Sequence, residues 1–368
     1  MSRIITNDIL YQKLKSHQNI LLIDVRDPKD FDLWNIYQSV NIPGSKLFRK
    51  AKSLPKDREI ITVCAKGNDS VGAANMLTRL GLNAVSLKGG LKAWNNVYDI
   101  IGVTPAKPSV LKVFQVKRLG KGCLSYVVVL PDKASTIIID PTLHTAIYTN
   151  FLKANKFKLR AVIDTHLHAD HVSGGKIMSL KFRVPYLLPD KSEAGLKFTS
   201  LSKGLAKIMK KIHFKILETP GHTPESVSIV LDRRFVFTGD TLFLDSVGRS
   251  DLTGDSQRSA RLLYESVIET LFSLDDDIFV LPSHSSQSLV PGPSMAATMR
   301  YVRRFNAIVQ NKNVEAFVNL QDSISPPPVN FVKIKQLNTS GKSLSLKEAE
   351  ILEFGHNSCS ITLKTGEV

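Results

Sequence analysis

Cysteine is scarce in this 368-residue chain, which has only three, at Cys64, Cys123 and Cys359. An odd number of widely spaced thiols excludes the disulfide framework of small secreted domains and favours a reducing compartment. The chain also lacks an apolar run long enough to cross a bilayer, and its first residues lack the apolar core of a signal peptide. We therefore expect a cytoplasmic protein that makes no membrane contact.

Acidic residues are in the minority: 33 Asp and Glu face 49 Lys and Arg, which gives a formal net charge of +16. The excess is spread along the chain and forms no long block of one sign. Even the most basic stretch, residues 203–215, alternates Lys with Leu, Ile and Met. This distribution disfavours a nucleic-acid partner and favours attraction of anionic small molecules.

The length is sufficient for two domains, each with its own core. In the first, residues 20–26 and 60–63 are apolar runs typical of buried strands. The second run leads directly into the polar loop formed by residues 64–70, and residues 71–80 then have helical spacing up to Gly81. In such an α/β unit the loop lies at the carboxyl ends of the strands, where ligands bind.

Cys64 opens this loop just before a helix N-terminus. Free backbone N–H groups and the positive end of the helix dipole favour its thiolate, which is the nucleophilic form. We expect a reactive cysteine, and the alternative is a buried structural one. Ser70 is the expected N-cap of the following helix.

Four segments, residues 22–26, 41–43, 64–70 and 89–94, resemble a single rhodanese domain and occur in that family's order. The resemblance covers about residues 1–101 and implies a central parallel sheet with flanking helices. It also implies that Cys64 forms a persulfide within a loop of six further residues: Ala65, Lys66, Gly67, Asn68, Asp69 and Ser70. Many rhodaneses have Arg where Asp69 stands. Without that arginine the loop has less positive charge to bind thiosulfate, so thiosulfate is in question as the sulfur donor. A non-catalytic binding module is the alternative for this domain.

Residues 102–110 contain two prolines and no periodicity, and we expect them to link this domain to a second one, residues 111–368. Short apolar strands are expected at residues 111–116, 125–130 and 136–140, followed by a helix at 145–154. Cys123 is interpreted as structural. A helix is expected at residues 295–305, and residues 330–368 are interpreted as a peripheral extension.

A cluster of imidazoles and a carboxylate follows the apolar run that ends at Ile163. It comprises His166, His168, Asp170 and His171. Because neutral imidazole is costly to bury unpaired and suits Zn, Fe, Cu or Ni, the cluster indicates a metal site. Three further donors, His222, Asp240 and His284, each follow another apolar run, so four predicted strand ends deliver ligands.

These seven residues resemble the ligand positions of the metallo-β-lactamase superfamily, over roughly residues 110–320. The resemblance implies an αββα sandwich with metal at one rim. Residues 239–243 and 247–251 are similar to the glyoxalase II branch, and the Gly-Arg-Ser-Asp form is closer to persulfide dioxygenases than to thioester hydrolases. In the dioxygenases the implied ligands of one Fe(II) are His166, His222 and Asp240. The implied supporting or second-metal residues are His168, Asp170, His171 and His284. Arg249 is a candidate for contact with the substrate, and the alternative for it is a structural salt bridge.

Spacing alone leaves the metal open, since the same residues can hold two Zn. The favoured function is oxidation of a low-molecular-weight thiol persulfide by O2 to thiol and sulfite, with sulfane-sulfur transfer through Cys64. Placing both activities on one chain raises the effective concentration of their shared intermediate. Glutathione and coenzyme A are candidate carriers, and sulfite or thiosulfate the further partners. A dinuclear zinc thioester hydrolase and a nuclease are the alternatives, and homo-oligomer formation stays open.

Overall fold

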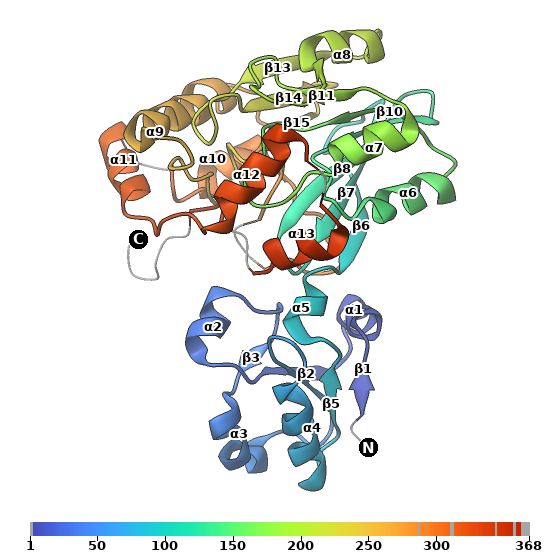
Figure 1. Cartoon of the computed structure of the whole chain (residues 1–368), viewed down its shortest axis with the longest axis vertical. Coiled ribbons are helices and arrows are strands. Elements are labelled where there is room, and N and C mark those ends of the chain that lie inside the picture. The colour runs from blue at the N-terminus through green and yellow to red at the C-terminus, as the bar shows by residue number, and fades with distance from the viewer. Residues whose placement is uncertain (1–2, 286–287, 310–312, 343, 356–357, 362–368) are drawn as a thin grey trace.

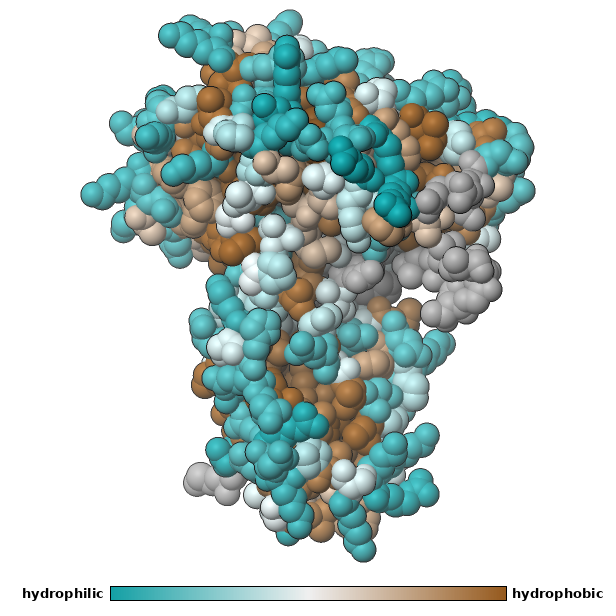
Figure 2. All heavy atoms as spheres, turned by 180° about the vertical axis from the view of Figure 1, so that it is seen from behind, coloured by the Kyte–Doolittle hydropathy of each residue, from teal (hydrophilic) through white to brown (hydrophobic). Residues whose placement is uncertain are grey.

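The computed structural model describes residues 3–285, 288–309, 313–342, 344–355 and 358–361. It has two bodies, a smaller N-terminal domain (blue in Figure 1) and a larger domain that contains the rest of the chain. On the face seen in Figure 2, hydrophilic side chains are spread over both bodies. No helix in the described part of the chain is long and apolar enough to cross a membrane.

The N-terminal domain is built on a parallel five-stranded sheet with the order β1-β5-β4-β2-β3. Its central strands are continuous apolar runs because helices lie on both faces of the sheet. This confirms the expected parallel sheet with flanking helices. The strands are β1 (Ile4–Ile5), β2 (Ile20–Asp24), β3 (Val40–Asn41), β4 (Glu59–Val63) and β5 (Ala84–Leu87). The helices are α1 (Asn7–Lys15), α2 (Pro28–Leu33), α3 (Gly44–Lys50), α4 (Asp69–Arg79) and α5 (Gly90–Trp94).

The start of α4 differs from the prediction. The helix begins at Asp69 and its N-cap is Asn68, so the prediction that Ser70 caps it is wrong. Ser70 is buried instead, and its Oγ lies 2.9 Å from Oγ of Ser86. Ser70 is thus the second residue of the helix, two positions after the N-cap.

The larger domain is a sandwich of two sheets, which confirms the expected αββα architecture. One sheet has seven strands in the order β12-β11-β10-β9-β8-β7-β6, and the other has five in the order β13-β14-β15-β16-β17. The strands of the first are β6 (Tyr98–Val103), β7 (Lys112–Arg118), β8 (Cys123–Val129), β9 (Ser135–Ile139), β10 (Lys158–Ile163), β11 (Tyr186–Leu188) and β12 (Thr199–Ser200). Those of the second are β13 (Phe214–Glu218), β14 (Val227–Leu231), β15 (Phe235–Gly239), β16 (Phe279–Pro282) and β17 (Ala297–Thr298).

Apolar side chains from the inner faces of both sheets meet in one core, where the rings of Tyr126 and Phe237 pack edge to face with centroids 5.1 Å apart. Helices cover the outer faces: α6 and α7 pack on the seven-stranded sheet, and α9, α10 and α11 on the five-stranded one. The helices are α6 (Thr145–Ala154), α7 (Gly175–Phe182), α8 (Leu201–Ile208), α9 (Ser256–Glu265), α10 (Met299–Phe305), α11 (Val314–Asp322), α12 (Asn330–Ser340) and α13 (Leu346–Leu352).

The junction between the domains differs from the expected linker. Strand β6 starts at Tyr98 and pairs antiparallel with β7 along its whole length, so Gly102 and Val103 belong to the larger domain's sheet. The alternating burial of β6 is that of an edge strand with one face on the core. Pro105 and Pro108 follow the strand and cannot extend it.

Two C-terminal expectations also need correction. The helix expected at residues 295–305 begins only at Met299, because Thr298 still pairs with β16 and caps α10 by accepting from the Tyr301 N–H. The described residues of the expected extension, 330–342, 344–355 and 358–361, are not peripheral, and residues 362–368 lie outside the described part of the chain. The buried Asn338 side chain donates to the carbonyls of His168 and His171, so this C-terminal segment packs directly on the histidine cluster.

Candidate metal centre and sulfur-transfer loop

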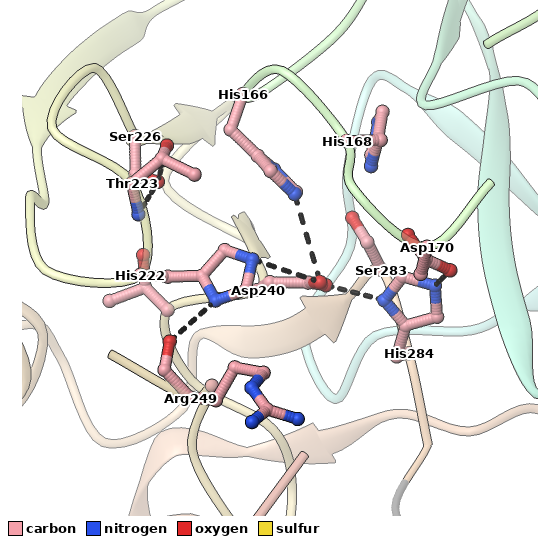
Figure 3. Close-up of polar contacts among 12 residues, drawn as sticks. His166, His168, Asp170, His222, Thr223, Ser226, Asp240, Arg249, Ser283 and His284 are labelled. Carbon is pink, nitrogen blue, oxygen red and sulfur yellow. Dashed lines mark hydrogen bonds and ion pairs between the residues drawn. The ribbon is translucent and has the colours of Figure 1, made fainter. Parts of the chain in front are cut away.

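Three of the predicted metal ligands converge from three loops at one rim of the sandwich (Figure 3). His166 follows β10, His222 follows β13 and Asp240 follows β15. Oδ2 of Asp240 lies 3.7 Å from Nε2 of His166 and 3.5 Å from Nε2 of His222. These ligand atoms all lie within 4.8 Å of one another, and all three residues are buried.

The converging atoms have no hydrogen-bond partner among the described residues: His166 Nε2, His222 Nε2 and Asp240 Oδ2. Leaving three buried polar atoms unpaired costs free energy that a bound cation would recover. The opposite nitrogen of His222, Nδ1, donates to the carbonyl of Arg249 at 2.8 Å. This hydrogen bond fixes the tautomer and presents the Nε2 lone pair to the centre. The residues therefore fit a metal ion.

Burial and neighbouring charge give two of the three ligands the protonation state that a metal needs. Burial opposes protonation of the third, His166, but the Asp240 carboxylate raises its pKa. Burial lowers the pKa of His222 to about 4, so its imidazole is neutral at physiological pH. Burial opposes ionisation of Asp240, but His284 and His166 hold the pKa of this carboxyl well below its usual range. A neutral imidazole and an ionised carboxylate are the ligand forms that bind divalent metals.

Three of the other predicted donors pair with one another next to this set. Nδ1 of His171 lies 3.0 Å from Oδ1 of Asp170, and Nε2 of His284 lies 2.8 Å from Oδ2 of the same carboxylate. His284 also reaches Oδ1 of Asp240 through its Nδ1, at 2.6 Å. The arrangement is a chain of alternating carboxylates and imidazoles that ends on Asp240.

His168 packs against the rings of His166 and His171, with centroids 4.2 and 4.3 Å away. Its Nε2 is 3.3 Å from Oδ1 of Asp140, and these two residues form a separate buried group with Asp164. Burial lowers the pKa of His168 to about 3, so this imidazole is neutral. His168 is therefore a neutral imidazole packed against two other histidines, with Asp140 beside its Nε2.

Sequence reasoning missed two thiols at this centre. Cys123 is interpreted above as structural. Its Sγ lies 3.7 Å from Oδ2 of Asp170, and its backbone forms an isolated antiparallel β-bridge with that of His284. Cys359 belongs to a buried group with Asp170, Asp240 and His284. Neither position shows a motif, because both thiols reach the centre through tertiary pairing. The only sequence signal for Cys123 is its place at the start of a strand.

Arg249 does not extend into a cavity. Its guanidinium forms a bidentate pair with Asp251, with N–O distances of 2.6 and 2.7 Å, and donates to the carbonyls of Ser325 and Ser358. Only 4% of the residue is exposed. Its visible roles are to anchor the C-terminal segment and to orient His222 through its own carbonyl.

A cleft of about 930 Å³ lies next to the histidine loop (residues 165–172) and is lined in part by Ala169. Its wall is mainly α12, which contributes the apolar side chain of Phe331 and the cations Lys333 and Lys335. Lys342 adds a third cation beyond the end of the helix. The cleft can therefore hold an anionic molecule with apolar parts.

The second predicted centre is the sulfur-transfer loop (residues 64–70) between β4 and α4. Cys64 is buried at its base, and its Sγ accepts from the Gly67 N–H at 3.1 Å and lies 3.4 Å from Oγ of Ser70. Gly90 packs so closely that an added Cβ would lie 2.2 Å from the carbonyl oxygen of Cys64. The loop thus holds the sulfur among donors, an arrangement that stabilises a thiolate or a persulfide anion.

A cleft of about 750 Å³ opens at this loop, and Asp27, Asp30 and Asp69 are part of its wall. Arg26 also lines it, but this guanidinium is paired with the buried Asp24, at 2.7 Å. Lys66 and Asn68 are exposed on the loop itself. The cleft wall therefore has more carboxylates than unpaired cations.

Comparisons with known proteins match both halves of this architecture. Residues 6–97 match the rhodanese-like domain, and residues 119–284 match the metallo-beta-lactamase superfamily. The "Persulfide dioxygenase ETHE1, mitochondrial" of Mus musculus is 30% identical over 212 residues, which cover 56% of this chain and 79% of that protein. The chain belongs to the metallo-beta-lactamase superfamily. Its N-terminal body is a rhodanese-like domain.

Further proteins and solved structures are similar to parts of this chain. The "Hydroxyacylglutathione hydrolase" of Francisella tularensis subsp. novicida is 32% identical over 189 residues, covering 46% of this chain and 67% of that protein. A metallo-beta-lactamase structure from Staphylococcus aureus matches with a TM-score of 0.54 and 25% identity, over 64% of this chain and 74% of that one. The structure of ETHE1 from Myxococcus xanthus shares the fold, with a TM-score of 0.51 and 22% identity over 62% of this chain and 97% of that one.

Proposed function

We propose that this chain is a persulfide dioxygenase joined to a sulfurtransferase, which converts R-S-SH, O2 and H2O into R-SH and sulfite. The observation that carries the proposal is the convergence of His166, His222 and Asp240 with their ligand atoms unpaired. Two imidazoles and one carboxylate form the facial set of non-haem iron oxygenases, which leaves positions open for substrate and O2. The similarity to the mouse persulfide dioxygenase supports the same reaction.

The pairing of the remaining donors supports a single iron rather than two zinc ions. His284 and His171 each contact one oxygen of Asp170, so both oxygens of this carboxylate already have partners. Nε2 of His171 and of His284 has no hydrogen-bond partner among the described residues and is the atom that a second metal would use. Fe(II) bound to the facial set would supply the activation of O2 and of the terminal sulfur. The residues of the chain orient that set: His284 occupies one oxygen of Asp240, and the carbonyl of Arg249 fixes His222.

The cleft lined by α12 is the proposed place for the thiol carrier. Lys333, Lys335 and Lys342 would attract the negative charges of glutathione or coenzyme A, and Phe331 would contact apolar parts. Ala169 lines the same cleft and belongs to the histidine loop, so a carrier bound there would lie beside the loop that holds His166.

The rhodanese-like domain would exchange sulfur through Cys64. The thiolate attacks the outer sulfur of R-S-SH, which forms Cys64-S-SH and releases R-S⁻, and the reverse step transfers the sulfur to a second acceptor. The Gly67 N–H stabilises the charged sulfur during the exchange. The carboxylates of the neighbouring cleft, Asp69 among them, disfavour the doubly anionic thiosulfate as donor.

A dinuclear zinc thioester hydrolase is the second candidate, supported by the similarity to a hydroxyacylglutathione hydrolase and by the adjacent group of Asp170, His171 and His284. Metal analysis and oxygen consumption separate the two. Protein purified without oxygen should contain close to one iron per chain, take up O2 with a thiol persulfide and release sulfite. Replacing His222 or Asp240 with Ala should abolish iron retention and turnover together. Two zinc ions per chain with thioester hydrolysis would contradict the proposal, as would oxygen uptake by iron-free His222→Ala protein.

A further inference from the structure

A buried arginine lies where the two domains meet. Arg118, at the end of β7, is fully buried and has three partners. Its Nε donates to the carbonyl of Asn95 at 2.9 Å and one terminal nitrogen donates to Oδ1 of Asn96 at 2.9 Å. The other terminal nitrogen lies 2.5 Å from Oε2 of Glu353. One guanidinium therefore joins the end of α5, in the rhodanese-like domain, to the C-terminal segment.

The second carboxylate oxygen of Glu353 accepts a hydrogen bond from the histidine loop. The N–H of Val172, the residue after His171, donates to Oε1 of Glu353 at 2.7 Å. Glu353 is 1% exposed, so this carboxylate is held between a backbone N–H of the histidine loop and the charge of Arg118. No sequence motif marks it, and the reaction itself does not require it.

The other end of α5 holds the sulfur-transfer loop. The N–H of Leu91 donates to the carbonyl of Cys64 at 3.0 Å, and the N–H of Lys92 donates to the carbonyl of Ala65 at 2.9 Å. Because α5 is only five residues long, the groups that hold Cys64 and the carbonyl that holds Arg118 lie within one short helix. A continuous set of hydrogen bonds thus runs from Cys64 through α5, Arg118 and Glu353 to the histidine loop.

A second connection starts at the next residue. The ring of Phe354 packs edge to face on Trp34, with centroids 5.3 Å apart. Nε1 of Trp34 donates to the carbonyl of Gly120 at 2.6 Å, and the carbonyl of Trp34 accepts from Arg26, which lines the cleft at the sulfur-transfer loop. Two neighbouring residues of the C-terminal segment therefore contact both domains.

A buried ion pair is weak evidence of a contribution to stability, since well-packed apolar residues often serve as well. Its value lies in fixing geometry. We propose that Glu353 is a positioning residue for both centres, which couples the histidine loop to Cys64 through Arg118 and α5. Metal binding at the histidine loop then changes the reactivity of Cys64. Modification of Cys64 in turn changes the metal affinity, because the coupling free energy between two sites is reciprocal. The inference rests on the proposed function only in taking the histidine loop to bind a metal.

The test uses full-length protein, Co²⁺ as the metal and iodoacetamide as the thiol reagent, with alkylation of Cys64 followed by peptide mass spectrometry. In the wild type, Co²⁺ should change the alkylation rate about fivefold, at the low end of typical coupling between sites. The Co²⁺ dissociation constant should also shift once Cys64 is alkylated, by a factor of its own, because reciprocity relates binding equilibria and not rates. Glu353→Gln keeps the side-chain shape but removes the charge facing Arg118, and should reduce both factors to near one. Glu315→Gln, which breaks the exposed pair with Arg261, is the matched control and should retain them.

The inference would be overturned if Co²⁺ left the alkylation rate of Cys64 in the wild type unchanged. It would also be overturned if Co²⁺ changed this rate in Glu353→Gln as much as in the wild type. If Glu353→Gln fails to fold, as judged by circular dichroism, Asn96→Ala decides. This substitution removes only one side-chain acceptor of Arg118. It should at least halve the logarithm of the factor by which Co²⁺ changes the alkylation rate. Unchanged coupling in Asn96→Ala would overturn the inference. Neither readout involves O2 or persulfide, so failure of the proposed dioxygenase activity is detected separately.

Discussion

Nδ1 of His284 lies 2.6 Å from Oδ1 of Asp240, which leaves the other carboxylate oxygen facing His166 and His222 (Figure 3). The imidazole thereby determines which oxygen of Asp240 is presented to a metal. Loss of such an orienting partner commonly lowers metal affinity by one to two orders of magnitude, whereas loss of a ligand removes the site.

We therefore expect His284→Ala to weaken Co²⁺ or Fe²⁺ binding roughly 10- to 100-fold without abolishing it. Titration of the metal-free protein, followed by absorbance or calorimetry, measures the change. His213→Ala, at an exposed histidine of the same domain, is the control and should bind as the wild type does. Complete loss of binding in His284→Ala would make His284 a direct ligand and would favour a two-metal centre.

Cys64→Ser tests the division of labour between the domains. The substitution removes the nucleophilic thiolate at nearly constant size. We expect loss of sulfur transfer to cyanide or to a thiol, while oxidation of added persulfide continues at close to the wild-type rate. Parallel assays of thiocyanate formation and oxygen uptake measure the two activities. A matching collapse of oxygen uptake would mean that persulfide must pass through Cys64 before it is oxidised.

Asp69→Arg tests the charge of the cleft next to Cys64. The carboxylate of Asp69 lines this cleft, and an arginine there would replace repulsion of thiosulfate by attraction. We expect kcat/KM for thiosulfate:cyanide sulfurtransfer to rise roughly tenfold at low salt, with the gain shrinking as salt is added. Asp57→Arg, an exposed change in the turn before β4, controls for net charge. Equal gains in both variants would assign the effect to the overall charge of the protein.

Asp99→Asn tests the contact between the domains. The buried Asp99 carboxylate lies 3.1 Å from Nζ of Lys117 and accepts from the Tyr11 hydroxyl at 2.7 Å and from the Gly292 N–H at 2.8 Å. Removing its charge leaves the fully buried Lys117 without its counter-ion, so we expect unfolding free energy to fall by about 3 kcal/mol at neutral pH. Urea unfolding of Asp99→Asn and of the exposed control Asp57→Asn measures the difference.

The same carboxylate gives the pH dependence of this contact. Burial opposes ionisation of Asp99, but the Gly292 N–H and the Tyr11 hydroxyl lower its pKa below the ordinary carboxyl value. A lowered pKa contributes stability that is present above the ordinary carboxyl pKa and is lost as pH falls through the lowered one. The gap between wild type and Asp99→Asn should therefore narrow in acid, and a gap independent of pH would assign the effect to packing.

The parts of the centre that sequence could predict are those delivered by local pattern. His166, His222 and Asp240 each follow an apolar strand, so their places at strand ends were predictable. His222 and Asp240 follow β13 and β15 of the five-stranded sheet and His166 follows β10 of the seven-stranded sheet, so their convergence depends on how the two sheets pack. Cys123 and Glu353 were not predictable, because they reach the centre through contacts with residues more than forty positions away. The resemblance to two families predicted the parallel sheet of the first domain and the two-sheet sandwich of the second. No local sequence pattern specifies which side chains pack between the domains.

The predicted ends of helices and strands were wrong where pairing with a distant segment overrides the local sequence pattern. Thr298 still pairs with β16 although its neighbours have helical periodicity, and Gly102 pairs with β7 although it lies beside a proline-rich stretch. Ser70 is a good capping residue by type, yet its hydroxyl is used on Ser86 inside the domain. In each case a partner distant in sequence determines the outcome.

Strand β6 begins four residues after α5 ends, and its first residue is already hydrogen-bonded into the sheet of the larger domain. The junction therefore contains no linker at which the chain could be divided into two separate domains. Cutting at residue 97 would leave β6 as a new N-terminus that must find its register unaided. Cutting after residue 103 would expose the long edge of β7, an open template for association with another chain. Replacing the rhodanese-like domain by another module would thus require a fusion partner whose last helix reproduces α5.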